Sequence, residues 1–140
     1  MIDFESECFQ KIKFSLPQIE QFVRSAGRDI EIASQSDIPE VIFKFSYDAL
    51  IKIGITLIAG EGYKVRSKTG HHIKILEKLG QILDNEDVKI MGNKMRQERN
   101  VDLYSGGSSI SEKDSRAYLD FVKDIFAKAS LTRRKHHRLG

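Results

Sequence analysis

Arg99, Asn100 and Asp102 are crowded into one stretch of a helical pattern, where charged and polar side chains replace the apolar ones expected of a buried helix. Met95, Arg99 and Asp102 fall on one helix face at spacings i, i+4 and i+7, and Met95 continues an apolar stripe. We therefore expect Arg99 and Asp102 at positions where core residues were due. Two interpretations remain open. One is a buried ion pair, whose net contribution to stability is small because desolvation offsets the attraction; the other is a polar cleft on the domain axis or between two copies.

Whether Arg99 and Tyr104 could act on a phosphodiester depends on the groups that such a reaction requires. Metal-independent cleavage of RNA needs a cation near the phosphate and a base that takes the proton of the ribose 2′-hydroxyl. Arg99 can supply the cation, but a tyrosine with a pKa near 10 is ionised in only about one molecule in a thousand at pH 7. Residues five apart also diverge by about 140° on a straight helix. The two side chains converge only if the helix loosens towards Gly106 or if two subunits meet; otherwise Tyr104 is a helix-end tyrosine packed on the next helix.

The motifs of most enzyme classes are absent from the sequence. It has no zinc-type Cys/His spacing and no H-E-x-x-H, and the glycines of 106–109 lack the lysine of a phosphate-binding loop. His71 and His72 are adjacent on a helix and point about 100° apart, so they cannot form one side of a metal site. We expect one of them to cap or pack and the other to be solvated, and His136 and His137 to lie in a basic C-terminal tail. The prediction is no metal and no cofactor.

The elements that position these residues are predicted to be helical throughout. Apolar residues recur with the period of a helix, and Pro17 and Pro39 stand where a first helical turn tolerates proline. The second helix is apolar nearly all round, which places it in the middle, and no alternating strand pattern is found. We therefore predict an all-α, up-and-down bundle of four to five helices, near Pro17–Ala33, Pro39–Ala59, His71–Leu83, Asp87–Leu103 and Ser111–Leu131, with a flexible link at 106–109.

The distribution of charge limits the classes of function that the sequence allows. The chain has 23 Lys and Arg against 20 Asp and Glu, but four of these cations (Arg133, Arg134, Lys135 and Arg138) lie in the last eight residues. The rest of the chain has 19 Lys and Arg against 20 Asp and Glu, so a uniformly basic surface for binding nucleic acid is excluded. We predict one domain over 1–131 and a basic, flexible tail over 132–140.

The sequence also predicts a cytoplasmic protein. Hydrophobic residues make up 40% of the chain, but no apolar run approaches the roughly 20 residues that span a bilayer. The first ten residues lack the apolar stretch of a signal peptide. Cys8, the single cysteine, is compatible with a reducing compartment. We therefore expect no membrane partner.

Two stretches give the sequence a family resemblance. The segments YDALIKIGITLIAGEGYKVRSKTGHHIKIL (Tyr47–Leu76) and MRQERNVDLYSG (Met95–Gly106) resemble the HEPN superfamily, the higher-eukaryote and prokaryote nucleotide-binding domains. The resemblance implies a homodimeric helical bundle, often encoded beside a small nucleotidyltransferase as a toxin–antitoxin pair. In active members an arginine and, after four to six residues, a histidine cleave RNA without a metal. Arg99 matches that arginine and Asn100 the polar residue after it, whereas Tyr104 stands where the histidine is expected.

The resemblance also implies a role for Tyr104, because in some members the partner nucleotidyltransferase attaches AMP to a tyrosine of this region. Two functions are therefore expected. The first is a toxin-like protein that acts on or binds RNA or a nucleotide, as a metal-independent endoribonuclease if it is an enzyme, centred on Arg99, Asn100, Asp102 and Tyr104. The alternative is a non-catalytic dimer that serves as a nucleotide-binding or protein-interaction module. A helical interaction domain with a fortuitous polar patch is the third possibility, and His72 is the next residue to test.

Overall fold

The computed structural model describes residues 1–105 and 110–139, with side chains described for 1–100 and 110–133. Within these residues the chain is a helical bundle with one short β-ribbon, which confirms the predicted all-α class. The predicted link at 106–109 lies outside the described residues. The elements are β1 (Phe9–Lys11), α1 (Leu16–Gln35), α2 (Pro39–Gly60), β2 (Tyr63–Val65), α3 (His71–Leu83), α4 (Glu86–Ser105) and α5 (Glu112–Leu139).

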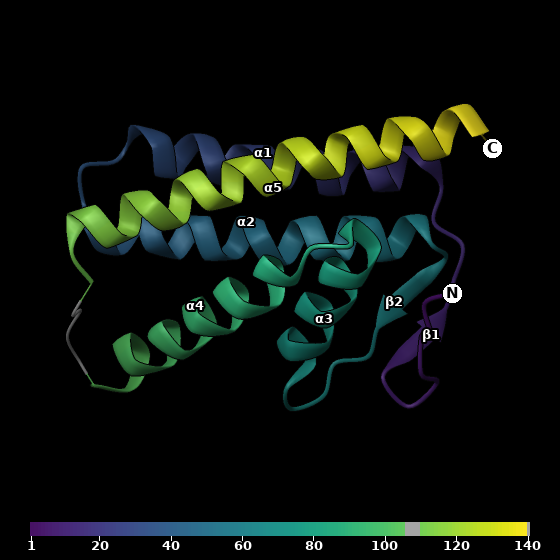
Figure 1. The fold of residues 1–140 in the computed structure, drawn as a ribbon, viewed down its shortest axis with the longest axis horizontal. Helices are drawn as coiled ribbons and strands as arrows, with labels where there is room; N and C mark the ends of the chain where they lie inside the picture. The colour runs from purple at the N-terminus through teal and green to yellow at the C-terminus, as the bar shows by residue number, and fades with distance from the viewer. Residues whose placement is uncertain (106–109, 140) are drawn as a thin grey trace.

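Helix α2 lies in the middle of the bundle, as its apolar character predicted. Helices α1 and α5 lie along it, while α3 and α4 form a hairpin that crosses it at an incline (Figure 1). Buried residues are found on every side of α2, among them Ile42, Leu50 and Ile53. One buried charge also anchors α1 to α2, since the Asp29 carboxylate lies 2.8 Å from the Lys52 ammonium. Helix α2 is therefore the central helix against which the other four helices pack.

The α3–α4 hairpin is packed closely through small residues. A β-carbon at Gly92 would stand 2.7 Å from Leu76 Cδ2, and one at Gly80 would stand 3.8 Å from Val88 Cβ. Gly80 of α3 thus faces Val88 of α4, and Leu76, four residues earlier on α3, faces Gly92, four residues later on α4. The same register places His72, in the first turn of α3, opposite Arg96.

A two-stranded antiparallel ribbon joins the N-terminal segment to the segment after α2. Phe9 pairs with Val65 and Lys11 with Tyr63, so the prediction of no strands and of an irregular polar loop from Lys64 was wrong at this point. Strands of three residues are too short to show an alternating pattern, and their pairing joins segments far apart in the sequence.

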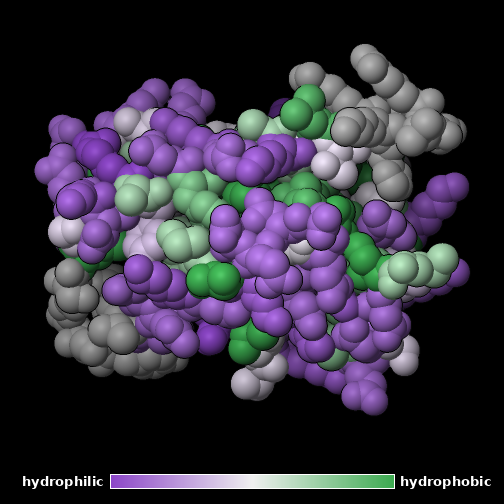
Figure 2. All heavy atoms as spheres, in the orientation of Figure 1, coloured by the Kyte–Doolittle hydropathy of each residue, from purple (hydrophilic) through white to green (hydrophobic). Residues whose placement is uncertain are grey.

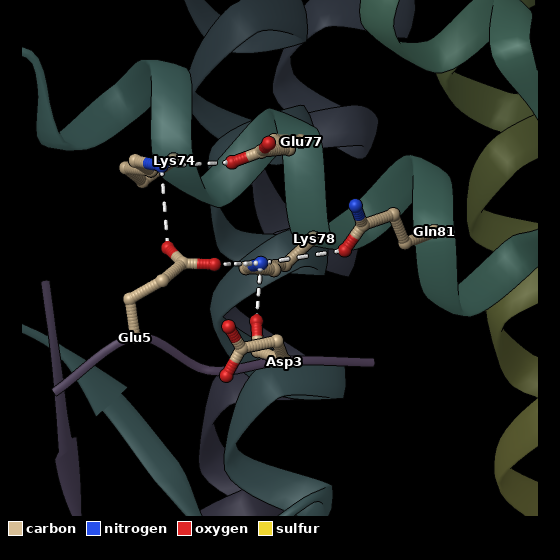
Figure 3. Close-up of polar contacts among 6 residues, drawn as sticks. All are labelled: Asp3, Glu5, Lys74, Glu77, Lys78 and Gln81. Carbon is tan, nitrogen blue, oxygen red and sulfur yellow. Dashed lines mark hydrogen bonds and ion pairs between the residues drawn. The ribbon is translucent and has the colours of Figure 1, made fainter. Parts of the chain in front are cut away.

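The N-terminal segment is also held by Lys78, a buried cation of α3. Its ammonium donates to Glu5 Oε1 at 2.7 Å and to the backbone carbonyl of Asp3, and Lys74 lies 3.2 Å from Glu5 Oε2 (Figure 3). Cys8 is half-buried beside this segment, and its carbonyl accepts a hydrogen bond from the backbone of Arg66. The N-terminus is therefore part of the folded body.

Helix α5 continues to Leu139, beyond the point at which the sequence predicted that the helix ends. Arg133 lies on this helix, and its guanidinium pairs with Glu20 of α1 at 2.8 Å. The first cation of the predicted tail therefore belongs to the bundle, because α1 offers it a carboxylate. Flexibility of 132–140 stays a prediction.

The surface drawn in Figure 2 is mostly hydrophilic on this face, with hydrophobic atoms in small separate areas. Large exposed hydrophobic side chains, such as Leu16, Ile38 and Ile90, are spread over different elements. In the part of the chain that the structure describes, no helix combines the length and the apolar character needed to span a bilayer.

Candidate functional site

A tyrosine of α2 and a histidine of α3 form the centre of the candidate site. The Tyr47 hydroxyl lies 2.8 Å from His72 Nδ1, and the two ring centroids are 5.7 Å apart. Tyr47 is fully buried, whereas His72 is half-buried. Helix α3 begins immediately before this histidine, at His71, after Gly70 with a positive φ of 79°. The start of α3 and the body of α2 therefore fix both rings.

Arginines of α4 complete the cluster. The Arg99 guanidinium lies over the Tyr47 ring, with Cζ 5.6 Å from the ring centroid, a geometry suited to cation–π attraction. Arg96 is half-buried, and its Nε donates to Asn93 Oδ1 across a long 3.5 Å. The ion pairs of the described side chains involve neither arginine. We name Tyr47, His72, Arg96 and Arg99 the Tyr47 cluster.

The electrostatic environment keeps both rings of the cluster uncharged at neutral pH. Burial, together with the electrostatic influence of His71, Arg99 and Arg96, lowers the pKa of His72 to about 4. Burial raises the pKa of Tyr47 to about 12, although the positive charges of Arg99 and Arg96 oppose this rise. The permanent charges of the cluster itself are therefore the two guanidinium groups, which favour an anion, while the nearby Asp48 carboxylate opposes one.

A pocket of about 350 Å³ begins beside the histidines and runs along α2. Its lining is largely apolar and comes from the start of α1, from α2, from β2 and its following loop, and from α3. His72 is thus in contact with open space as well as with Tyr47. The lining residues are Phe14, Phe22, Ile51, Ile55, Ile58, Tyr63, Lys64, Val65, Ser67, His71, His72 and Ile75.

Arg99 is in the cluster, but it is not in the core. Arg99 and Asn100 are exposed, whereas Met95 is fully buried. The prediction that Arg99 occupies a core position was therefore wrong, and an ion pair of Arg99 with Asp102 stays a prediction because that carboxylate lies outside the described side chains. The reason is the unequal length of the hairpin: α3 has 13 residues and α4 has 20, so the end of α4 extends past the start of α3 and nothing of α3 covers it.

The other predicted residues lie apart from this cluster or outside the described side chains. Asn100 has no contact with the cluster among the interactions of the described residues. Asp102 and Tyr104 are on the backbone of α4, but their side chains lie outside the described ones. Their proposed roles therefore stay predictions.

Sequence reasoning missed the pairing of Tyr47 with His72. One packing histidine was expected, and His72 packs against Tyr47. The other was expected to be solvated, but His71 is half-buried and its Nδ1 lies 2.8 Å from the Lys68 carbonyl oxygen. The sequence did contain a signal for the position of His72. If the chain turns back at Asp84 into an antiparallel helical hairpin, the start of α3 lies opposite Arg96.

No group of three or more His, Cys, Asp or Glu residues is arranged to hold a metal ion among the residues that the structure describes. The arrangement that is present can bind an anion between fixed cations and an uncharged imidazole. Comparisons with protein-family models, with curated proteins and with solved structures find no match to this chain.

Proposed function

We propose that this chain is a HEPN-type protein of the cytoplasm that binds RNA or a nucleotide by its phosphate, as the toxin-like partner of a small nucleotidyltransferase. The observation that carries the proposal is the Tyr47 cluster, in which Arg99 and Arg96 stand beside an uncharged His72 without a carboxylate partner among the described side chains. The arginine that the family resemblance selects, Arg99, is in this cluster.

The ligand class follows from the kind of charge at the site. Guanidinium groups bind phosphate oxygens through paired N–H donors. The chain without its last eight residues carries about as many anions as cations, so attraction of RNA depends on this local cluster more than on the whole surface. Asp48, the nearby carboxylate, is paired with Lys44 at 2.9 Å, which reduces its repulsion of a phosphate.

Binding without cleavage is the second candidate function, and the chemistry of the site favours it. The histidine expected after Arg99 is replaced by Tyr104 in the sequence. A tyrosine is a poor base near pH 7. The chain would then act as a dimer that holds a nucleotide or RNA, or that interacts with the nucleotidyltransferase, and cleavage products would not accumulate.

RNA affinity of an Arg99→Ala variant tests the proposal. Fluorescence anisotropy with a short labelled single-stranded RNA should show about 10- to 100-fold weaker binding, because a charge-assisted hydrogen bond to phosphate is lost. The dependence of log affinity on log salt should become less steep by about one. Lys89→Ala is the matched control, since Lys89 is an exposed cation on the same helix and away from the cluster. Equal effects of both substitutions would contradict the proposal.

The partner proposal has a separate test at Tyr104. If the nucleotidyltransferase encoded beside this gene modifies Tyr104 with AMP, incubation with ATP should add one adenylyl group to the wild-type chain and none to Tyr104→Phe. Mass spectrometry measures this directly, and Tyr63→Phe is the control tyrosine. Modification of Tyr104→Phe at the wild-type level would show that Tyr104 is not the acceptor.

A further inference from the structure

The Tyr47 hydroxyl has one proton to donate and one partner to receive it. Tyr47 is fully buried, so solvent does not reach its hydroxyl. Among the described side chains, the hydrogen-bond partner of this hydroxyl is His72 Nδ1, at 2.8 Å. A buried hydroxyl whose proton has no acceptor is strongly disfavoured. Donation from the Tyr47 O–H to Nδ1 satisfies both groups.

We infer that Tyr47 holds His72 in the tautomer with its proton on Nε2, so that His72 is an uncharged hydrogen-bond donor to the phosphate bound by Arg99. The inference rests on the proposed function for the identity of the ligand and on the structure for the tautomer. In a neutral imidazole one nitrogen accepts and the other donates, so fixing Nδ1 as the acceptor fixes Nε2 as the donor. Tyr47 is thus a positioning residue, and His72 touches the ligand.

The surroundings of His72 support the uncharged state. The groups that act on it are His71 on its own helix, Arg96 and Arg99 on α4, and Asp48 on α2. Burial lowers the pKa of His72 most, His71, Arg99 and Arg96 lower it further, and Asp48 opposes them. A second positive charge on this ring would repel Arg99, whereas a neutral N–H adds a donor without that repulsion.

The place of His72 suits this role. The Arg99 guanidinium and the His72 ring approach the same phenol, Arg99 over its face and His72 at its hydroxyl. His72 also lines the pocket of about 350 Å³, so part of its ring faces open space, although neither Arg96 nor Arg99 lines that pocket. Among the described residues Nε2 has no hydrogen-bond partner, which leaves its proton for a ligand.

The tautomer decides what the histidine can do chemically. Nε2 already carries a proton and Nδ1 is occupied by the Tyr47 hydroxyl, so neither nitrogen can take the proton of a ribose 2′-hydroxyl. His72 therefore strengthens and orients phosphate binding and does not serve as the base of RNA cleavage.

Nuclear magnetic resonance of the imidazole nitrogens tests the tautomer without any ligand. In the ¹⁵N-labelled full chain at neutral pH, His72 should show a proton on Nε2 and a bare, hydrogen-bonded Nδ1, and the pattern should persist until the pH approaches about 4. Tyr47→Phe should allow a mixture of both tautomers. Tyr118→Phe is the control, because it removes the hydroxyl of another buried tyrosine. A proton on Nδ1 in the wild-type chain would overturn the inference.

RNA affinity of two His72 variants tests the donor role. His72→Gln keeps an uncharged N–H donor near the position of Nε2 and should bind labelled RNA within about threefold of wild type, whereas His72→Ala should bind roughly threefold to tenfold more weakly. Equal loss in both variants would contradict the donor role. Undiminished binding by Arg99→Ala would instead refute the proposed function, whatever tautomer His72 adopts, so the two failures are distinguishable.

Discussion

Gly92 of α4 lies against Leu76 of α3 so closely that a β-carbon at position 92 would stand 2.7 Å from Leu76 Cδ2 and 3.1 Å from Cδ1. Real β-carbons essentially never show a contact of 2.7 Å, so a side chain at position 92 would force Leu76 or the two helices to shift. The next turn of this hairpin carries His72 and Arg96. The glycine therefore sets the spacing of the two helices that bear the Tyr47 cluster.

Gly92→Ala should lower the free energy of unfolding by about 1–3 kcal/mol, because the added methyl group overpacks the hairpin. Urea denaturation followed by circular dichroism measures the change. Gly60→Ala is the control, since a β-carbon at Gly60 meets nothing within 4 Å and the substitution should be neutral or stabilising by up to about 1 kcal/mol. A Gly92→Ala variant as stable as Gly60→Ala would show that the close contact is not a constraint.

Most of the helices could be predicted from the sequence because apolar residues recur in them with a helical period. The predicted third helix, His71–Leu83, has the bounds of α3, and α2 ends one residue after its predicted end. The ribbon of β1 and β2 could not be predicted, since its three-residue strands depend on a partner elsewhere in the chain. Helix α5 continues past Leu131, although its residues there are mostly polar, and Arg133 gains an ion pair with α1.

The site was predictable in part. The polar stretch of α4 pointed to Arg99, and the structure places Arg99 in a cationic cluster, although at the surface rather than in the core. Tyr47 gave no signal, because a tyrosine within an apolar helix has the pattern of an ordinary core residue. Its hydrogen bond to His72 depends on how α3 packs on α2, which is a tertiary contact that local pattern does not contain.

Acid should release the N-terminal segment. The hydrogen bond from Lys78, with a further contribution from Lys74, lowers the pKa of Glu5 below its ordinary 4.5, although partial burial opposes this. A carboxyl whose pKa is lower in the folded state stabilises the fold above its unfolded pKa, and that stabilisation is lost as the pH falls from about 4.5 through the folded pKa.

Hydrogen exchange of the ribbon amides should therefore accelerate relative to the α2 amides as the pH falls below about 4.5, after correction for the intrinsic pH dependence of exchange. The Ile12 and Arg66 amides report on the ribbon, since both donate hydrogen bonds to backbone carbonyls there. Glu5→Gln, which cannot ionise, should remove the pH dependence. Ribbon protection that changes with pH equally in both proteins would exclude Glu5 as the cause.

Assembly is expected to be dimeric, in keeping with the resemblance and with a cationic site that two copies can share across a twofold axis. Light scattering at micromolar concentration should give about twice the chain mass of 16.0 kDa. A mass of one chain at that concentration would contradict the shared site.

The most direct test of the account is to map where RNA binds on the full chain. In a nuclear magnetic resonance titration with a short single-stranded RNA that lacks terminal phosphates, the signals of His72, Arg96 and Arg99 should shift together and saturate at one stoichiometry. Tail cations should add a weaker, salt-sensitive response, because they act through counterion release. Shifts confined to 132–140, with the Tyr47 cluster unchanged, would contradict the central claim.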